Sequence, residues 1–398
     1  MNQTAGIYIH IPFCERKCTY CNFNTTDFFA DLAARYIEAV NQEINYWGAK
    51  LSAEKSRLEA THEFTGDKLA VDTIFFGGGT PSIVEAEQLA SIIDSARQAF
   101  AVASDAEITI EINPATFTRQ KIAGWLRGGI NRASVGVQSF IDTELAGLSR
   151  THNTAQVRQT VEALRQAGFN NLSLDLIAGL PAQSKQDWAF NLLEALKLRP
   201  EHLSLYLLEV KESTQLYAQI KRGLVPQPDE DLAGEMYEMI SEATQQAGYE
   251  HYEISNFALI SDLPKSYRAK HNVKYWTGAP FYGIGCGAHS YDGRARWVNR
   301  LKTESYIEAI VARGHAINDR RELSHEERAA DAIFMGLRLA EGINLESFQK
   351  DYGVDILERY ADELPRLLDA ELLRIENRCL MLTARGRLLS NEVFMTFV

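Results

Sequence analysis

Three of the chain's five cysteines lie within eight residues, at Cys14, Cys18 and Cys21. Thiolates at the spacing C-x3-C-x2-C, in a loop that follows Pro12, can surround one soft inorganic centre. Structural zinc normally takes four ligands, often as two C-x2-C pairs, and this chain has no second pair. A [4Fe–4S] cluster takes one cysteine per iron, so three cysteines would leave one iron open to chemistry. Zinc with a distant histidine, and three thiols without a ligand, stay open as alternatives.

A second motif, FFGGGTPS, places three consecutive glycines directly before Thr80. Glycines let the backbone turn sharply and approach a ligand closely, and this spacing matches neither G-x-G-x-x-G nor a P-loop. Ser82 and Glu85 then form a capping-box pattern, so a turn that opens a helix is the simpler explanation of this motif.

Polar side chains recur near the ends of the later apolar runs, namely Glu111, Gln138, Arg150 and Asp175. A carboxylate in an otherwise apolar strand is costly to bury unpaired, so Glu111 and Asp175 each need a partner. Arg150 is a candidate for one such ion pair. Ion pairs within the fold are therefore the alternative to ligand binding at these positions.

The elements that must position these residues are six short apolar runs, which alternate with amphipathic helical segments over residues 1–210. The runs are IYIHI, AVDTIFF, EITIEI, ASVGVQS, NLSLDLI and LSLYLLEV. Such alternation predicts parallel βα units with right-handed crossovers. Six units, where a closed TIM barrel has eight, predict an α/β fold with an open, partial (β/α)6 barrel and its chemistry at the carboxyl ends of the strands.

Three segments are expected along the chain: the barrel over 1–210, a less regular extension over 211–320, and a small winged-helix-like domain over 321–398. The extension contains the motifs HNVKYW and GIGCGAHS. Residues 325–398 hold 9 Lys and Arg against 14 Asp and Glu, a net charge of −5 that is unfavourable for DNA binding.

The composition excludes several classes of protein. The formal net charge is −12, which argues against a broad phosphate-binding surface and hence against nucleic acid as a partner. No run of 18 apolar residues occurs, and the first residues lack a basic segment followed by a long apolar one. We therefore expect a cytoplasmic protein with at most peripheral membrane contact.

The cysteine loop after a first strand resembles that of the radical S-adenosylmethionine (SAM) superfamily. The resemblance implies that Cys14, Cys18 and Cys21 ligate a [4Fe–4S] cluster, that SAM chelates the open iron, and that an electron from the cluster cleaves SAM to a 5′-deoxyadenosyl radical. Tyr20 would pack beside the cluster. Gly78, Gly79 and Thr80 would contact the methionine part of SAM.

The ordered series IHIPFC, GGGTPS, IEINP, GVQSF, LSR and DLIAGLP is similar to the oxygen-independent coproporphyrinogen III oxidase (HemN-like) family, over most of the chain. Position by position, this resemblance implies that five residues contact SAM: Tyr8, Glu111, Gln138, Arg150 and Asp175.

Two features separate the oxidases of this family from its heme chaperones. The oxidases carry a further cysteine two residues after the third cluster ligand, where this chain has Phe23. The chaperones have phenylalanine there, together with a motif HNxxYW, which His271, Asn272, Tyr275 and Trp276 supply. Without the resemblance, a structural histidine near aromatic residues explains HNVKYW best; with it, His271 is expected to ligate heme iron.

The resemblance thus implies a heme chaperone with a [4Fe–4S] cluster, SAM and heme. It would deliver heme to acceptors such as membrane respiratory enzymes, form a cluster-dependent homodimer, cleave SAM slowly at most, and meet the inner face of the membrane peripherally. The alternatives are a coproporphyrinogen III oxidase and a zinc-dependent hydrolase.

Two further cysteines are expected to have no ligand role. Cys286, in GIGCGAHS beside His289, is interpreted as a small buried residue, with heme thiolate ligation as the alternative. Cys379 is expected to pack in the core.

Overall fold

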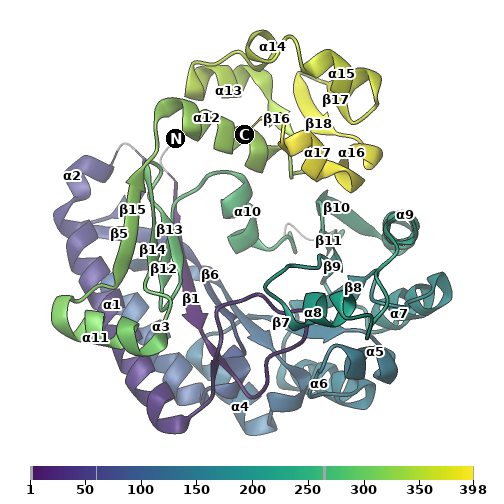
Figure 1. The fold of residues 1–398 in the computed structure, drawn as a ribbon. Coiled ribbons are helices and arrows are strands. Elements are labelled where there is room, and N and C mark those ends of the chain that lie inside the picture. Colours follow the sequence, from purple (N-terminus) through teal and green to yellow (C-terminus); the bar gives the residue numbers. More distant parts are fainter. Residues whose placement is uncertain (1–2, 60, 263–265, 398) are drawn as a thin grey trace.

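A curved parallel sheet forms the centre of the computed structural model, which describes residues 3–59, 61–262 and 266–397 (Figure 1). Neighbouring strands follow each other in the order β1-β5-β6-β7-β8-β9 and all pair in parallel. These strands are β1 (Ala5–Ile11), β5 (Lys68–Gly78), β6 (Ala101–Ile112), β7 (Arg132–Gln138), β8 (Leu172–Ala178) and β9 (His202–Leu207). The prediction of a partial, six-stranded barrel is confirmed.

Helices cover the outer face of this sheet (Figure 1). In β1, Ile7, Ile9 and Ile11 are completely buried, while Tyr8 and His10 alternate with them and face the inside of the barrel. Helix α1 packs against α3 and α11. The covering helices are α1 (Ala30–Ala53), α3 (Ala86–Ala99), α4 (Arg119–Gly128), α6 (Thr154–Ala167), α7 (Lys185–Lys197), α9 (Glu230–Gln246) and α11 (Thr303–Arg313).

The sheet continues beyond both edges of the barrel. Strand β12 pairs in parallel with β1, and three antiparallel strands follow it; β11 and β10 extend the edge at β9. The added strands are β10 (Tyr249–Glu253), β11 (Asn256–Leu259), β12 (Phe281–Ile284), β13 (His289–Tyr291), β14 (Ala295–Asn299) and β15 (Ile317–Glu322). Strands after residue 210 thus belong to the same sheet as the barrel strands. The segment boundaries at 210 and 320 stay a prediction.

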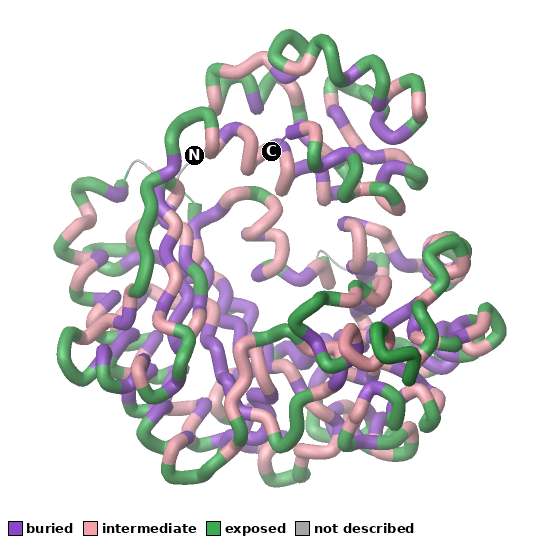
Figure 2. Tube along the Cα trace, viewed as in Figure 1, coloured by how far each residue is buried: buried purple, intermediate pink, exposed green. Residues whose placement is uncertain are grey.

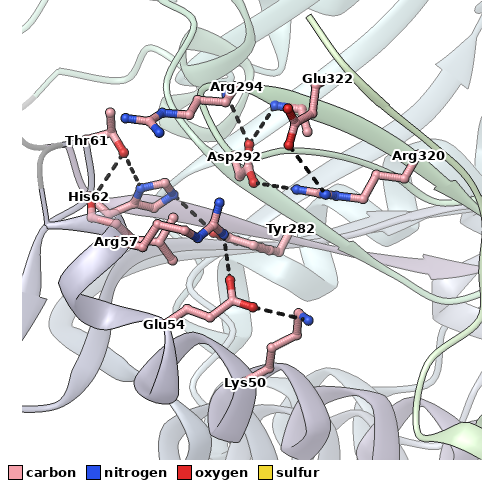
Figure 3. A network of polar contacts seen from close by, with 12 residues as sticks. Lys50, Glu54, Arg57, Thr61, His62, Tyr282, Asp292, Arg294, Arg320 and Glu322 are labelled. Atoms are coloured by element: carbon pink, nitrogen blue, oxygen red, sulfur yellow. Dashed lines mark hydrogen bonds and ion pairs between the residues drawn. The ribbon is translucent and has the colours of Figure 1, made fainter.

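A network of hydrogen bonds and ion pairs connects the added strands to the segment between α1 and β5 (Figure 3). His62 is fully buried, and its Nε2 lies 3.0 Å from the Tyr282 hydroxyl on β12. On the same network, the Arg320 guanidinium of β15 lies 3.4 Å from the Asp292 carboxylate. The elements near His62 are the short α2 (Lys55–Leu58) and β4 (Phe64–Thr65).

The C-terminal part has a hydrophobic core of its own, around residues such as Ile333, Leu380 and Phe397. Figure 2 shows buried stretches within this part of the chain. Helices surround a three-stranded antiparallel sheet in the order β16-β18-β17, which confirms the small winged-helix-like domain. Its elements are α12 (His325–Gly336), β16 (Ile343–Asn344), α13 (Leu345–Tyr352), α14 (Ile356–Arg359), α15 (Leu364–Asp369), β17 (Leu373–Glu376), β18 (Cys379–Leu382), α16 (Ala384–Leu388) and α17 (Ser390–Phe394).

The remaining short elements are β2 (Phe13–Cys14), β3 (Thr26–Asp27), α5 (Asp142–Gly147), α8 (Gln215–Lys221) and α10 (Lys270–Trp276), with 3-10 turns at Pro81–Ile83 and Pro114–Thr116. Across the described ranges, no helix combines the length and the apolar character that crossing a bilayer requires.

Candidate cluster and cofactor site

The three clustered cysteines lie in and beside the loop that follows the first barrel strand. Cys14 ends β2, while Cys18 and Cys21 belong to the loop, and all three are partly buried free thiols. The Cys14 sulfur lies 3.5 Å from the Thr80 hydroxyl, and the Arg150 guanidinium lies 3.4 Å from the Cys18 sulfur. Residues from three distant parts of the sequence therefore meet at these thiols.

The thiols line a cavity of about 370 Å³ at the carboxyl ends of the barrel strands, where barrel enzymes place their chemistry. The other predicted residues that line it are Tyr20, Gly78, Gly79, Thr80, Glu111, Gln138, Arg150 and Asp175. Tyr8 and His271 are not among its lining residues. Tyr8 instead stacks on Phe75, inside the barrel.

The donor set suits an iron–sulfur cluster better than a single metal ion. Within the described ranges, no three side chains of His, Cys, Asp or Glu converge closely enough to hold one ion. A cluster places a separate iron beside each thiolate, so its ligands need not converge on one point. Burial raises the pKa of the Cys14 and Cys21 thiols, and a bound metal would favour their deprotonation.

The glycine turn is joined to the cysteine loop through backbone hydrogen bonds. The amide of Gly79 donates to the carbonyl of Ile11 at 2.8 Å, and the amide of Thr80 donates to the carbonyl of Phe13 at 2.8 Å. A Cβ at Gly79 would lie 2.7 Å from the Phe13 carbonyl oxygen. Only glycine allows this approach, so the turn and the cysteine loop form one packed unit.

Gly78→Ala is expected to lower the free energy of unfolding by about 2 kcal/mol, because Gly78 has φ +109° and its Cβ would lie 2.5 Å from the His10 ring. Gly147→Ala is the matched control, since nothing lies within 4 Å of the Cβ added there and its φ is not left-handed. Denaturant unfolding of both variants measures the difference. Equal losses at the two glycines would contradict this account of the turn.

Glu111 and Asp175 form an acidic pair inside the cavity. Glu111 accepts a hydrogen bond from the Gly78 amide at 3.1 Å, and Asp175 accepts one from the Ser134 hydroxyl at 2.9 Å. Burial, with the charge of Asp175 as the second cause, raises the pKa of Glu111 to about 8. Burial also raises the pKa of Asp175.

Neither carboxylate has the ion-pair partner that the sequence suggested. Arg150 donates to the Cys18 sulfur and to the Gly136 carbonyl, the latter at 2.9 Å. No ion pair within 4.0 Å joins Glu111 or Asp175 to a cation among the described residues. The charge of the buried Arg132 acts on both carboxylates from beyond ion-pair distance and only partly offsets the effect of burial on their pKa values, so the pair can also accommodate a cationic ligand in the cavity.

His271, the predicted heme ligand, is buried with 1% of its surface exposed, and both of its ring nitrogens have partners. Nδ1 lies 2.8 Å from the Thr73 hydroxyl, and Nε2 lies 2.9 Å from the Tyr275 hydroxyl. Burial, together with nearby Lys274, lowers its pKa to about 3. In this conformation neither nitrogen can reach an iron atom, so heme ligation by His271 stays a prediction that requires the ring to leave its partners.

The structure adds residues that the sequence did not single out. Ser134, Gly136, Tyr206 and Lys211 also line the cluster cavity. Position along the strands could have pointed to them: Gly136 and Tyr206 lie near the carboxyl ends of β7 and β9, and Ser134 lies two residues before Gly136, on the same face of β7.

The two remaining cysteines differ from each other. Cys286 is completely buried, as expected, and its sulfur lies 3.6 Å from the Tyr36 hydroxyl. Cys379 is half-buried on β18, so the expectation that it packs in the core is wrong. The alternation of side chains along β18, the middle strand of its sheet, turns Leu380 into the core and Cys379 away from it.

Comparison with known proteins gives consistent matches. The model of the radical SAM superfamily matches residues 8–192, and that of the HemN C-terminal domain matches residues 323–389. The chain is 34% identical over 392 residues to the heme chaperone HemW of Bacillus subtilis, covering 98% of each chain. It is 31% identical to the radical S-adenosyl methionine domain-containing protein 1, mitochondrial, of Bos taurus, covering 100% of this chain and 88% of that one.

Among solved structures, coproporphyrinogen III oxidase HemN of Escherichia coli matches with a TM-score of 0.81 at 22% identity. The match covers 100% of this chain and 90% of that one. At this identity the likeness shows a shared fold.

Proposed function

Because the chain belongs to the HemW family of HemN-like radical SAM proteins, we propose that it binds heme and delivers it to acceptor proteins such as membrane respiratory enzymes. The observation that carries the proposal is the 34% sequence identity to a heme chaperone over 98% of both chains. It is joined by Phe23, which stands where the oxidases have a further cysteine. Phe23 lines the cluster cavity and is 62% exposed. We further propose a cluster-dependent homodimer, slow SAM cleavage at most, and peripheral contact with the inner face of the membrane.

The cluster cavity would hold the [4Fe–4S] cluster and SAM. Cys14, Cys18 and Cys21 would ligate three irons, and the fourth iron would stay free of protein ligands. When bound, the cluster supplies an electron that can cleave SAM. Glu111 and Asp175 would attract the cationic groups of SAM, while Gln138 and the Gly78–Gly79 turn would position it. Arg150 would donate a hydrogen bond to the sulfur of Cys18.

SAM affinity is expected to rise with pH up to about pH 8. Without ligand, Glu111 keeps its proton below a pKa of about 8. A cationic ligand favours the carboxylate, so binding releases this proton and is strengthened as pH rises, by at most about tenfold per pH unit. Above about pH 8 the proton is already absent and the affinity should level off.

Isothermal titration calorimetry of the cluster-loaded protein at pH 6.5, 7.5 and 8.5, values chosen to bracket this pKa, measures the effect. Glu111→Gln should bind SAM about tenfold more weakly and lose the pH dependence. Glu209→Gln, an exposed carboxylate at the rim of the same cavity, is the control. A wild-type affinity that does not change with pH would contradict the role of Glu111.

The heme-chaperone proposal and the oxidase alternative differ in what the protein does to porphyrins. Titrated with heme, the wild-type chain should bind about one equivalent with a defined Soret band. Incubated anaerobically with coproporphyrinogen III, SAM and a reductant, it should form no protoporphyrinogen by turnover. Catalytic formation of protoporphyrinogen would overturn the chaperone proposal.

A further inference from the structure

A second cavity, of about 280 Å³, lies between α10, the added strands β12 to β14 and the C-terminal domain. In Figure 1, α10 lies to the right of these strands and below α12, which it contacts. The cavity shares no lining residue with the cluster cavity. Five large aromatic side chains are among its lining residues: Tyr275, Trp276, Phe281, Tyr291 and Tyr352. Flat aromatic side chains from four separate elements suit a flat, apolar ligand.

One histidine in this wall is free to bind a metal. His289 begins β13 and is exposed, and neither of its ring nitrogens forms a hydrogen bond with any described residue. Tyr291 lies two residues further on, and it pairs directly with Phe281 of β12 and with Arg296 of β14. Cross-strand partners and residues two apart share a face of a sheet, so His289 stands on the aromatic face. Partial desolvation of the ring, with the charge of Arg296 as the second cause, lowers the pKa of His289 and so favours the neutral imidazole.

Two arginines line the same cavity, and they differ in whether they already form an ion pair. Arg296 forms an ion pair with Asp331 at 3.1 Å and stacks over the Tyr291 ring. Arg328 forms no ion pair with the described residues, and its Nε is buried without a hydrogen-bond partner. A guanidinium in this state is a ready partner for a carboxylate.

We propose that this second cavity is the heme site, with His289 as an axial ligand of the iron and Arg328 as the partner of a heme propionate. The proposal rests on the proposed function of heme binding. A cavity of about 280 Å³ is small for a ligand site, whose usual range is about 300–1,000 Å³. Part of the macrocycle would therefore stay exposed, which suits a carrier that passes its ligand on.

The same geometry gives His271 a positioning role. Its Nε2 holds the Tyr275 hydroxyl, and the Tyr275 ring meets Phe281 edge to face, with ring centroids 4.6 Å apart. His271 thus fixes the position of the Tyr275 ring in the cavity wall, and it does not line the cavity itself. Both His271→Ala and Tyr275→Phe should weaken heme binding only a few-fold and keep the spectrum of a histidine-ligated heme.

Titration of the full-length wild-type chain and of His289→Ala with ferric heme tests the axial ligand. His289→Ala should bind heme at least tenfold more weakly and lose the spectrum of histidine ligation, and added imidazole should restore that spectrum. His325→Ala, an exposed histidine of α12 outside the cavity lining, is the matched control and should bind as the wild type does. Circular dichroism checks that each variant is folded.

Arg328→Gln should weaken binding of heme but not of heme dimethyl ester, which has no free propionate. Wild-type affinity and spectrum in His289→Ala, with loss of histidine ligation in His271→Ala, would overturn this inference. A wild-type chain that binds no heme at all would instead overturn the proposed function.

Discussion

Replacement of Cys18 by alanine is expected to abolish the iron–sulfur cluster. After anaerobic reconstitution the variant should hold close to no iron and sulfide, against about four of each per chain in the wild type. Cys18 lies in the middle of the loop, and the Arg150 guanidinium lies 3.4 Å from its sulfur. Losing one of only three ligands leaves two irons without protein anchors, so no stable cluster should remain.

The matched control is Cys379→Ala, which removes a thiol that lies on β18, outside the cluster cavity. This variant should keep the full iron and sulfide content. If Cys18→Ala retained a wild-type cluster, or if both variants lost it equally, the assignment of the three clustered cysteines would be contradicted. Iron and sulfide analysis, together with the visible absorption spectrum, reads out both variants.

Glu43→Gln is expected to cost several kcal/mol of unfolding free energy at acidic pH. Glu43 is completely buried on α1, and it accepts hydrogen bonds from the Gly285 amide, the Asn299 amide group and the Tyr306 hydroxyl at 2.7 to 2.9 Å. Even when the carboxyl of Glu43 is protonated, both of its oxygens can accept hydrogen bonds, whereas the amide nitrogen of glutamine accepts none, so the substitution leaves at least one buried donor unpaired. These contacts hold the loop of Cys286, whose carbonyl accepts a hydrogen bond from Asn24 beside the cysteine loop.

The cost of Glu43→Gln should depend on pH in a defined direction. Burial raises the pKa of Glu43 to about 7 from its ordinary value of 4.5. Between these values the folded chain keeps a proton that the unfolded chain has lost, so the contribution of Glu43 to stability falls as pH rises from 4.5 to about 7. Over this window the difference between wild type and variant should shrink by on the order of 3 kcal/mol.

Denaturant unfolding of wild type and Glu43→Gln at pH 5 and pH 8, on either side of the pKa of about 7, measures this change. Glu38→Gln is the control, because Glu38 is exposed on the same helix. The control should differ from the wild type by at most about 0.5 kcal/mol at both pH values. A Glu43→Gln cost that is the same at both pH values would contradict the raised pKa.

The barrel could be predicted because its strands are buried on both faces and read as short apolar runs, such as NLSLDLI, between helical segments. The cavity could be anticipated for a related reason: parallel strands end at one edge, so Gly78, Glu111, Gln138 and Asp175 had to lie near each other once the strand order was given. The sequence alone could not tell that Arg150 turns toward Cys18 and away from the two carboxylates.

The added strands escaped prediction because they are short and lack a clear period of two, and β12 and β13 lie within the glycine-rich stretch FYGIGCGAHSY. The second cavity depends on this sheet extension, since the register of Phe281, Tyr291 and Arg296 places His289 on its aromatic face. This register cannot be read from the sequence, which draws attention to His271 through the motif HNVKYW instead. Its burial between Thr73 and Tyr275 is a tertiary feature that the motif HNVKYW does not encode by itself.

Transfer of heme tests the central claim most directly. The cluster-reconstituted, heme-loaded chain is mixed anaerobically with the apo form of a heme-containing respiratory subunit, and the Soret band of the acceptor is followed. A carrier should load this acceptor faster than heme dissociates into apomyoglobin, a passive trap. Equal rates into both proteins, or heme that stays on the chain, would contradict the account.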